Sequence, residues 1–127
     1  MRLFFSILSM AYVAGIFLLA SSSLSQGLSK FNPYSLLHIP LYGILTFFLI
    51  FSFIPLKINP INQINQRKPL FLSGGIASIV AIADEIYQVY VPGREASVTD
   101  VLLDFIGITL VLFFAFRFLK KKTSFIR

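Results

Sequence analysis

The chain has 127 residues, of which 57% are hydrophobic and 13% are charged, and its mean hydropathy is +0.84. Soluble domains are about 45–50% apolar and about 25% charged, so these values exclude an ordinary soluble enzyme, and the hydrophobicity excludes a disordered chain. With no Cys and a single His, the sequence also excludes disulfides, thiolate zinc sites and His-rich metal sites. The length fits one domain, residues 1–127.

Four apolar runs follow one another along the chain, each near the roughly 20 residues that cross about 30 Å of hydrocarbon. They cover about residues 3–20, 35–56, 70–90 and 101–119. The segments between them are rich in Ser, Asn, Gln, Pro and Gly, which is typical of loops. The sequence therefore predicts an all-α polytopic membrane protein, a bundle of four transmembrane helices.

The first run carries no charge, and it follows Arg2 and precedes small residues, as a signal peptide would. It is longer than the usual apolar region of about 7–15 residues and lacks a clean A-x-A cleavage pattern. We expect a retained helix, and cleavage of this run stays open as the alternative.

The second run contains one ionisable residue, His38, near its start, and Tyr42 follows four residues later. If Asn32 and Pro33 begin this helix as N-cap and first residue, Pro40 lies inside it and kinks it. The relative placement of His38 and Tyr42 therefore depends on where the helix starts.

The third run ends in polar residues that continue a stripe of small ones. Ser73, Ala77, Ala81 and Glu85 recur every four residues, and Gln88 lies one turn beyond on nearly the same face. Small side chains let transmembrane helices approach closely. The spacing therefore predicts that Glu85 faces the inside of the bundle.

The fourth run carries a similar face, on which Asp100, Asp104 and Gly107 are spaced by four and three residues. Ser97 stands where an N-cap would, with Asp100 as the third helical residue, so helix capping alone is a sufficient role for Asp100. Asp104 lies about one turn into the helix, where capping does not require an acid.

The loop between the third and fourth runs reads Val91-Pro92-Gly93-Arg94. Pro fixes φ and Gly permits a left-handed turn, so Arg94 emerges beside the acids. A guanidinium suits bidentate binding of a carboxylate or phosphate. An internal ion pair of Arg94 with Glu85 or Asp104 is the alternative interpretation.

The basic residues indicate the orientation, since nine of the eleven lie at the termini or in the 56–69 connector, leaving Lys30 and Arg94 for the other side. The positive-inside rule places both termini in the cytoplasm and the 21–34 and 91–100 loops outside. All five acids lie between residues 84 and 104, at the same outer end as His38. We infer one polar layer near the outer interface.

Simpler interpretations stay open for several other residues. Glu95 fits a solvated loop charge, and Asp84 a protonated or paired interface residue. His38 and Tyr42 fit polar and aromatic rings at the lipid headgroup level. The Lys120–Lys122 run fits a cytoplasmic stop signal that touches anionic lipid.

The segment from Asp84 to Gly107 resembles the second signature of VanZ-like membrane proteins, in which Glu, Gln, Arg, Ser and Asp precede a Gly-containing helix. The first signature of that family, an Asp-Lys pair followed by His and Tyr, is half present. His38 and Tyr42 match it, whereas Tyr34 and Ser35 stand where Asp and Lys are usual.

Asp104 is a second departure, because the family commonly has Asn there. The resemblance implies a protein of the bacterial cell envelope, in a family associated with glycopeptide resistance and especially with resistance to teicoplanin. We expect a multi-pass protein of the cytoplasmic membrane whose outer polar site binds an envelope component. The candidate binding residues are His38, Tyr42, Glu85, Gln88, Arg94, Asp100 and Asp104.

Other functions stay open, and no catalytic residue is assigned. As a membrane enzyme acting on a lipid-linked or phosphate-bearing substrate, the chain would use Glu85 as a base, His38 as an acid or base and Arg94 as a phosphate clamp. A Mg²⁺ ion held by Glu85, Asp100 and Asp104 belongs to that alternative. Our expectation is no metal ion and no cofactor.

Two non-enzymatic alternatives are a proton or ion carrier and a structural subunit of a larger complex. The cytoplasmic halves of the first three runs are nearly devoid of polar residues, which disfavours a carrier. Expected partners are the lipid bilayer and a lipid-linked envelope component or a glycopeptide. No nucleic acid is expected, because membrane topology explains the basic residues. Oligomeric state and helix order are not predicted.

Overall fold

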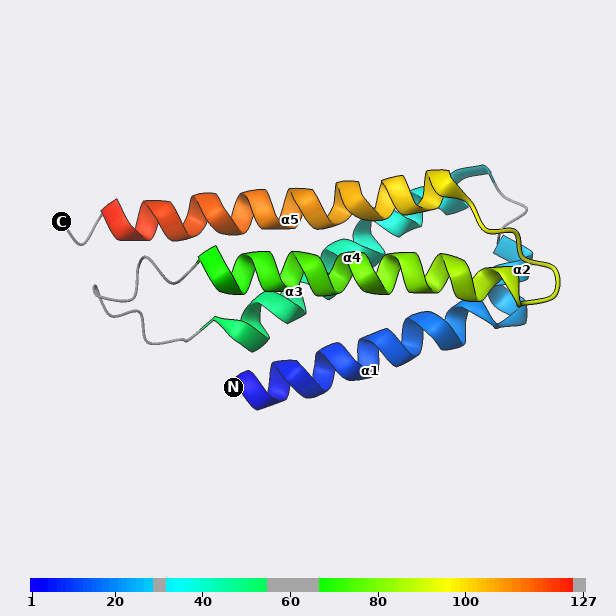
Figure 1. The fold of residues 1–127 in the computed structure, drawn as a ribbon, viewed down its shortest axis with the longest axis horizontal. Coiled ribbons are helices and arrows are strands. Elements are labelled where there is room, and N and C mark those ends of the chain that lie inside the picture. The colour runs from blue at the N-terminus through cyan, green and yellow to red at the C-terminus, as the bar shows by residue number, and fades with distance from the viewer. Residues whose placement is uncertain (29–31, 55–66, 125–127) are drawn as a thin grey trace.

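The computed structural model describes residues 1–28, 32–54 and 67–124, and the regular elements within these ranges are all helices (Figure 1). They are α1 (Arg2–Ala20), α2 (Ser23–Leu28), the 3₁₀ helix η1 (Asn32–Leu37), α3 (His38–Phe53), α4 (Arg67–Val89) and α5 (Val98–Ser124). Four stretches are long and apolar enough to cross a membrane: Arg2–Ala20, Ser35–Phe53, Arg67–Val89 and Val98–Lys120. The prediction of an all-α protein with four membrane-spanning helices is confirmed.

The helix ends differ from the predicted ones where apolarity is a poor guide. α4 starts at Arg67 rather than at residue 70, and α5 continues through Arg117 to Ser124. Arg and Lys are good helix formers, so a helix continues past the hydrocarbon that its apolar part crosses. α3 ends at Phe53, because Ile54 is extended with ψ 125° and precedes a proline. Residues 55 and 56 of the second predicted run lie outside the described residues.

Pro40 does not interrupt a helix interior. The segment from Asn32 to Leu37 is a 3₁₀ helix, and the α-helix starts only at His38. Pro40 therefore lies in the first turn of α3, where no backbone N–H is needed for an intrahelical bond. As a result His38 and Tyr42 lie one regular turn apart, with ring centroids separated by 6.5 Å and ring planes inclined by 9°.

α3 is the centre of the bundle and packs against α1, α4 and α5. In Figure 1 it runs behind α4 and α5. Its buried side chains Tyr42, Leu45 and Leu49 meet Ala77 and Ala81 of α4 in the core. The small side chains predicted on α4 are thus the surface that admits the larger side chains of α3.

Gly107 lets α5 and α3 touch through their backbones. A Cβ atom at this position would collide with the backbone oxygen of Ile39. Asp104 lies three residues before Gly107, on the face that meets α3. The close contact therefore carries Asp104 to the start of α3.

Several polar side chains lie inside the bundle beside its apolar core, and many large apolar side chains cover its outside. Ser9, Thr46 and Ser73 are buried, whereas Phe71, Phe114 and Phe118 are exposed. This distribution suits lipid as the surrounding solvent, because an exposed polar side chain in hydrocarbon has no partner. α1 joins α3 partly through such inner groups, as where Tyr12 Oη donates to the backbone oxygen of Leu41 over 3.1 Å.

The antiparallel order brings three helix ends together. The start of α3, the end of α4 and the start of α5 lie at the right of Figure 1, together with the loop between α4 and α5. The first turns of α3 and α5 and the last turns of α4 carry the buried ionisable side chains. One end of the bundle therefore holds the candidate site.

Candidate functional site

Eight side chains from α3, α4, α5 and the loop before α5 form what we call the polar layer. Seven are buried and Arg94 is half-buried. The members of the polar layer are His38, Tyr42, Asp84, Glu85, Gln88, Arg94, Asp100 and Asp104. The structure thus brings together all seven candidate binding residues named from the sequence and adds Asp84 to them.

Gln88 connects the acids of α4 to the arginine of the loop. Its Nε2 donates to Glu85 Oε1 over 3.1 Å and to Asp84 Oδ2 over 3.3 Å. Its Oε1 accepts a hydrogen bond of 2.7 Å from Arg94 Nη2. A side-chain amide can donate and accept at once, so Gln88 holds two carboxylates on one side and a guanidinium on the other.

Glu85 fixes the start of α5. Its Oε2 accepts a hydrogen bond of 2.8 Å from the backbone N–H of Ser97. Ser97 Oγ in turn accepts a hydrogen bond of 3.4 Å from the backbone N–H of Asp100. This is the predicted N-cap contact. The acid of α4, the cap and the first turn of α5 are therefore connected in sequence.

His38 lies between two carboxylates of α5. Its Nδ1 is 2.8 Å from Asp104 Oδ1, and Asp104 is completely buried. Its Nε2 is 3.8 Å from Asp100 Oδ2. Asp100 and Asp104 are one turn apart, so the imidazole meets the same face of α5 twice. Asp100 therefore does more than cap its helix, and His38 does more than place a polar ring at an interface.

Asp84 is the residue that the sequence interpretation left outside the site. Tyr42 Oη donates to Asp84 Oδ2 over 3.3 Å, and Asp84 is only 2% exposed. The signal was its spacing, because Asp84 lies three residues after Ala81 and four before Gln88, both on the inner face of α4. Tyr42 is buried as well, so it is not a belt aromatic at the membrane surface.

The loop before α5 brings Arg94 to the rim of the polar layer. The backbone N–H of Arg94 donates to the oxygen of Val91 over 3.2 Å, with Pro92 second and Gly93 third in the turn. Gly93 has φ 79°, which is the left-handed conformation expected from the sequence. A cavity of about 790 Å³ opens beside this turn, and Arg94, Ser97 and Asp100 are among its lining residues.

The remaining sequence expectations concern residues outside the polar layer. Glu95 is exposed, as expected for a solvated loop charge, and Lys120 is exposed as well. The side chains of Tyr34, Lys121 and Lys122 lie outside the described residues.

The polar layer buries more negative than positive groups. Four carboxylates, those of Asp84, Glu85, Asp100 and Asp104, face one imidazole and one guanidinium. Three carboxylate oxygens, Asp84 Oδ1, Asp100 Oδ1 and Asp104 Oδ2, are buried without a hydrogen-bond partner among the described residues. Buried charges are costly unless they are paired or bind a metal ion. Chemically, the layer therefore has unused capacity to bind a proton, a cation or a polar ligand.

Comparison with known protein families gives a match that covers most of the chain. The profile of the VanZ/LLP1 family matches residues 3–120, which cover nearly all of the four long helices. No curated protein and no solved structure shows significant similarity to the chain.

Proposed function

The chain belongs to the VanZ/LLP1 family, and from that premise we propose that Arg94, at the edge of the polar layer, binds an anionic group of a lipid-linked component of the bacterial envelope. The binding occurs at the outer face of the cytoplasmic membrane. When the protein binds this component, a glycopeptide such as teicoplanin has less access to its target. The drug is therefore less active.

The observation that carries this proposal is the position of Arg94. Arg94 lines a cavity of about 790 Å³, and Gln88 orients its guanidinium by accepting a 2.7 Å hydrogen bond from Nη2. An oriented guanidinium presents several N–H donors in one plane, which match the oxygens of a phosphate or carboxylate. The cavity has the size of a small-molecule site.

The distribution of basic residues supports an outward-facing polar layer. Arg67 and Lys68 start α4, and Arg117 and Lys120 lie near the end of α5. Both positions are at the opposite end of the bundle from Arg94 (Figure 1). By the positive-inside rule the end with Arg67 and Lys120 faces the cytoplasm, so the polar layer faces outward.

The experiment measures teicoplanin susceptibility of a Gram-positive host that carries empty vector, wild type, Arg94→Ala or Glu85→Gln. Arg67→Ala is the matched control, because it removes an arginine at the other end of α4. Membrane levels of all proteins are compared by immunoblot. We expect wild type and Arg67→Ala to lower susceptibility and the other two variants to lose this effect. Equal susceptibility with wild type and empty vector at full expression would contradict the proposed link to the drug.

A further inference from the structure

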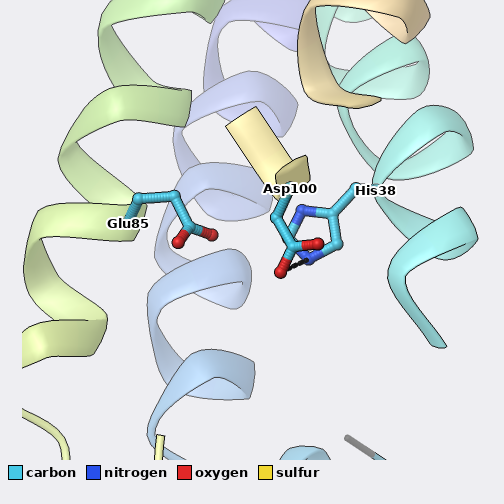
Figure 2. Close-up of side chains that lie close together, drawn as sticks. All are labelled: His38, Glu85 and Asp100. Atoms are coloured by element: carbon cyan, nitrogen blue, oxygen red, sulfur yellow. Dashed lines mark ion pairs between the residues drawn. The ribbon is translucent and has the colours of Figure 1, made fainter. Parts of the chain in front are cut away.

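We propose that His38, Glu85 and Asp100 together bind one divalent transition-metal ion, with Zn²⁺ as the best fit to their donor atoms. Each residue offers one ligand atom, and the three atoms lie within 4.8 Å of one another. Figure 2 shows the three side chains converging from separate helices, with the Glu85 carboxylate turned toward Asp100 and the imidazole. Metal binding goes beyond the proposed function and does not depend on it.

The donor set is one that divalent metals use. Imidazole nitrogen suits Zn²⁺ and its neighbours, while carboxylate oxygen also suits Mn²⁺ and Mg²⁺. Three protein ligands with a remaining position for water are typical of reactive zinc sites. The sequence interpretation considered Glu85, Asp100 and Asp104 as ligands of a Mg²⁺ ion. In the structure Asp104 instead contacts His38 Nδ1. His38 therefore replaces Asp104 in the ligand set, beside Glu85 and Asp100.

Asp104 positions the imidazole as a metal-binding histidine is usually positioned. Asp104 Oδ1 lies 2.8 Å from His38 Nδ1, and a carboxylate at this distance favours a proton on Nδ1. In the tautomer with the proton on Nδ1, the nitrogen that binds a metal ion is Nε2, which lies 3.8 Å from Asp100 Oδ2. Ligating histidines commonly have such a carboxylate on the other ring nitrogen.

Asp100 supplies a second, independent observation that points to a bound cation. The residue is 9% exposed, yet its Oδ1 has no hydrogen-bond partner among the described residues. A buried acceptor without a partner carries a free-energy cost. Coordination to a cation would remove that cost and would also offset the repulsion between Asp100 and Glu85.

The side chains need only small movements to bind the ion. In tetrahedral geometry, ligand atoms about 2.0–2.2 Å from a zinc ion lie about 3.3–3.6 Å from one another. They are within 4.8 Å here, so movements on the order of 1 Å bring them to the ion. Asp100 also lines the cavity of about 790 Å³, which gives the ion a route of entry. An open coordination position on that side would accept water or an anionic oxygen.

The first test measures metal content. The protein is purified in detergent with an affinity tag that contains no histidine, stripped with a chelator, incubated with Zn²⁺ or Mn²⁺, and dialysed. Inductively coupled plasma mass spectrometry then gives the bound metal. We expect one Zn²⁺ per chain. Less than about a tenth of an equivalent of either metal on folded wild type would overturn the proposal.

Variants identify the ligands. Glu85→Gln and Asp100→Asn are each expected to weaken Zn²⁺ binding at least tenfold, and Asp104→Asn about 10–100-fold through the orientation of His38. Glu95→Gln is the matched control, because it removes an exposed acid from the same end of the molecule, and its binding should equal that of wild type. Size-exclusion chromatography and circular dichroism verify folding. Undiminished binding in folded Glu85→Gln and Asp100→Asn would contradict this ligand set.

A measurement on the wild type keeps the proposal testable if those variants do not fold. The chain contains a single histidine, so ¹⁵N-labelled histidine gives one pair of ring nitrogen signals by NMR. Zn²⁺ should move the Nε2 signal and leave Nδ1 protonated, as its bond to Asp104 requires. If saturating Zn²⁺ leaves both ring signals unchanged, His38 is not a ligand.

Discussion

The backbone N–H of Ser97 donates a 2.8 Å hydrogen bond to Glu85 Oε2, so an acid near the end of α4 holds the residue that caps α5. This bond holds the loop between α4 and α5 at its α5 end. Gln88 holds the guanidinium itself. The polar layer is therefore a connected network that sets the position of the loop, and not a set of independent side chains.

The first prediction concerns that bond. In Glu85→Gln a single carbonyl oxygen replaces two carboxylate oxygens that accept from Ser97 and Gln88, so one donor loses its acceptor. Leaving a buried donor without a partner costs about 1–3 kcal/mol. We expect hydrogen exchange at the Ser97 amide to become about tenfold faster, equivalent to about 1.4 kcal/mol. Mass spectrometry of peptides that span the loop measures it, with Glu95→Gln as control. Unchanged protection would show that Glu85 does not hold the loop.

The second prediction concerns the contact between α3 and α5. Gly107→Ala places a methyl group against the backbone oxygen of Ile39, and overpacking of this kind costs about 1–3 kcal/mol of unfolding free energy. Gly75→Ala is the matched control, since nothing lies within 4 Å of its Cβ position. Thermal unfolding in mild detergent should show a lower midpoint for Gly107→Ala alone. Equal midpoints for the two variants would mean that α5 is free to move away from α3.

The third prediction concerns Tyr42. Tyr42→Phe removes the hydrogen bond to Asp84 Oδ2 while retaining the buried ring, so we expect a loss of about 1–3 kcal/mol of unfolding free energy. Tyr90→Phe makes the same chemical change at a residue that is 79% exposed and should have no effect. Unfolding midpoints measure both. A Tyr42→Phe variant as stable as wild type would show that Asp84 gains nothing from the hydroxyl.

The fourth prediction concerns orientation, and the absence of cysteine makes it simple to test. Glu95→Cys and Lys68→Cys each introduce one thiol at an exposed position, on opposite ends of the bundle. In intact cells without an outer membrane, an impermeant maleimide should label Glu95→Cys and should label Lys68→Cys only after permeabilisation. The opposite labelling pattern would place the polar layer in the cytoplasm.

The helices and the inner faces were predictable because membrane burial leaves a strong signal. An apolar run has to be helical to satisfy its backbone in hydrocarbon, and an acid within such a run has to face protein or water. The periodicity of Ser73, Ala77 and Ala81 therefore indicated where Glu85 points. The Gly107 spacing similarly indicated a close helix contact.

The pairing inside the polar layer was not predictable from the sequence. The position of His38 between Asp100 and Asp104 depends on the rotation and height of α3 relative to α5, which no local pattern specifies. The start of α3 depends on whether the residues after Pro33 form a 3₁₀ helix or an α-helix, which the sequence did not indicate. Asp84 was missed because the stripe of small residues was followed only at four-residue spacing. A residue at three-residue spacing, such as Asp84 after Ala81, also faces inward.

The most direct test of the proposed function is the binding of polyprenyl phosphate to the purified protein, measured by native mass spectrometry with and without a chelator. We expect wild type and Arg67→Ala to retain the phosphate lipid over its neutral alcohol. Arg94→Ala should bind it at least tenfold more weakly, equivalent to about 1.4 kcal/mol, with Arg94→Lys between the two. Equal binding by wild type and Arg94→Ala, or no preference for the phosphate, would contradict the account of Arg94 as the anion-binding residue of the polar layer.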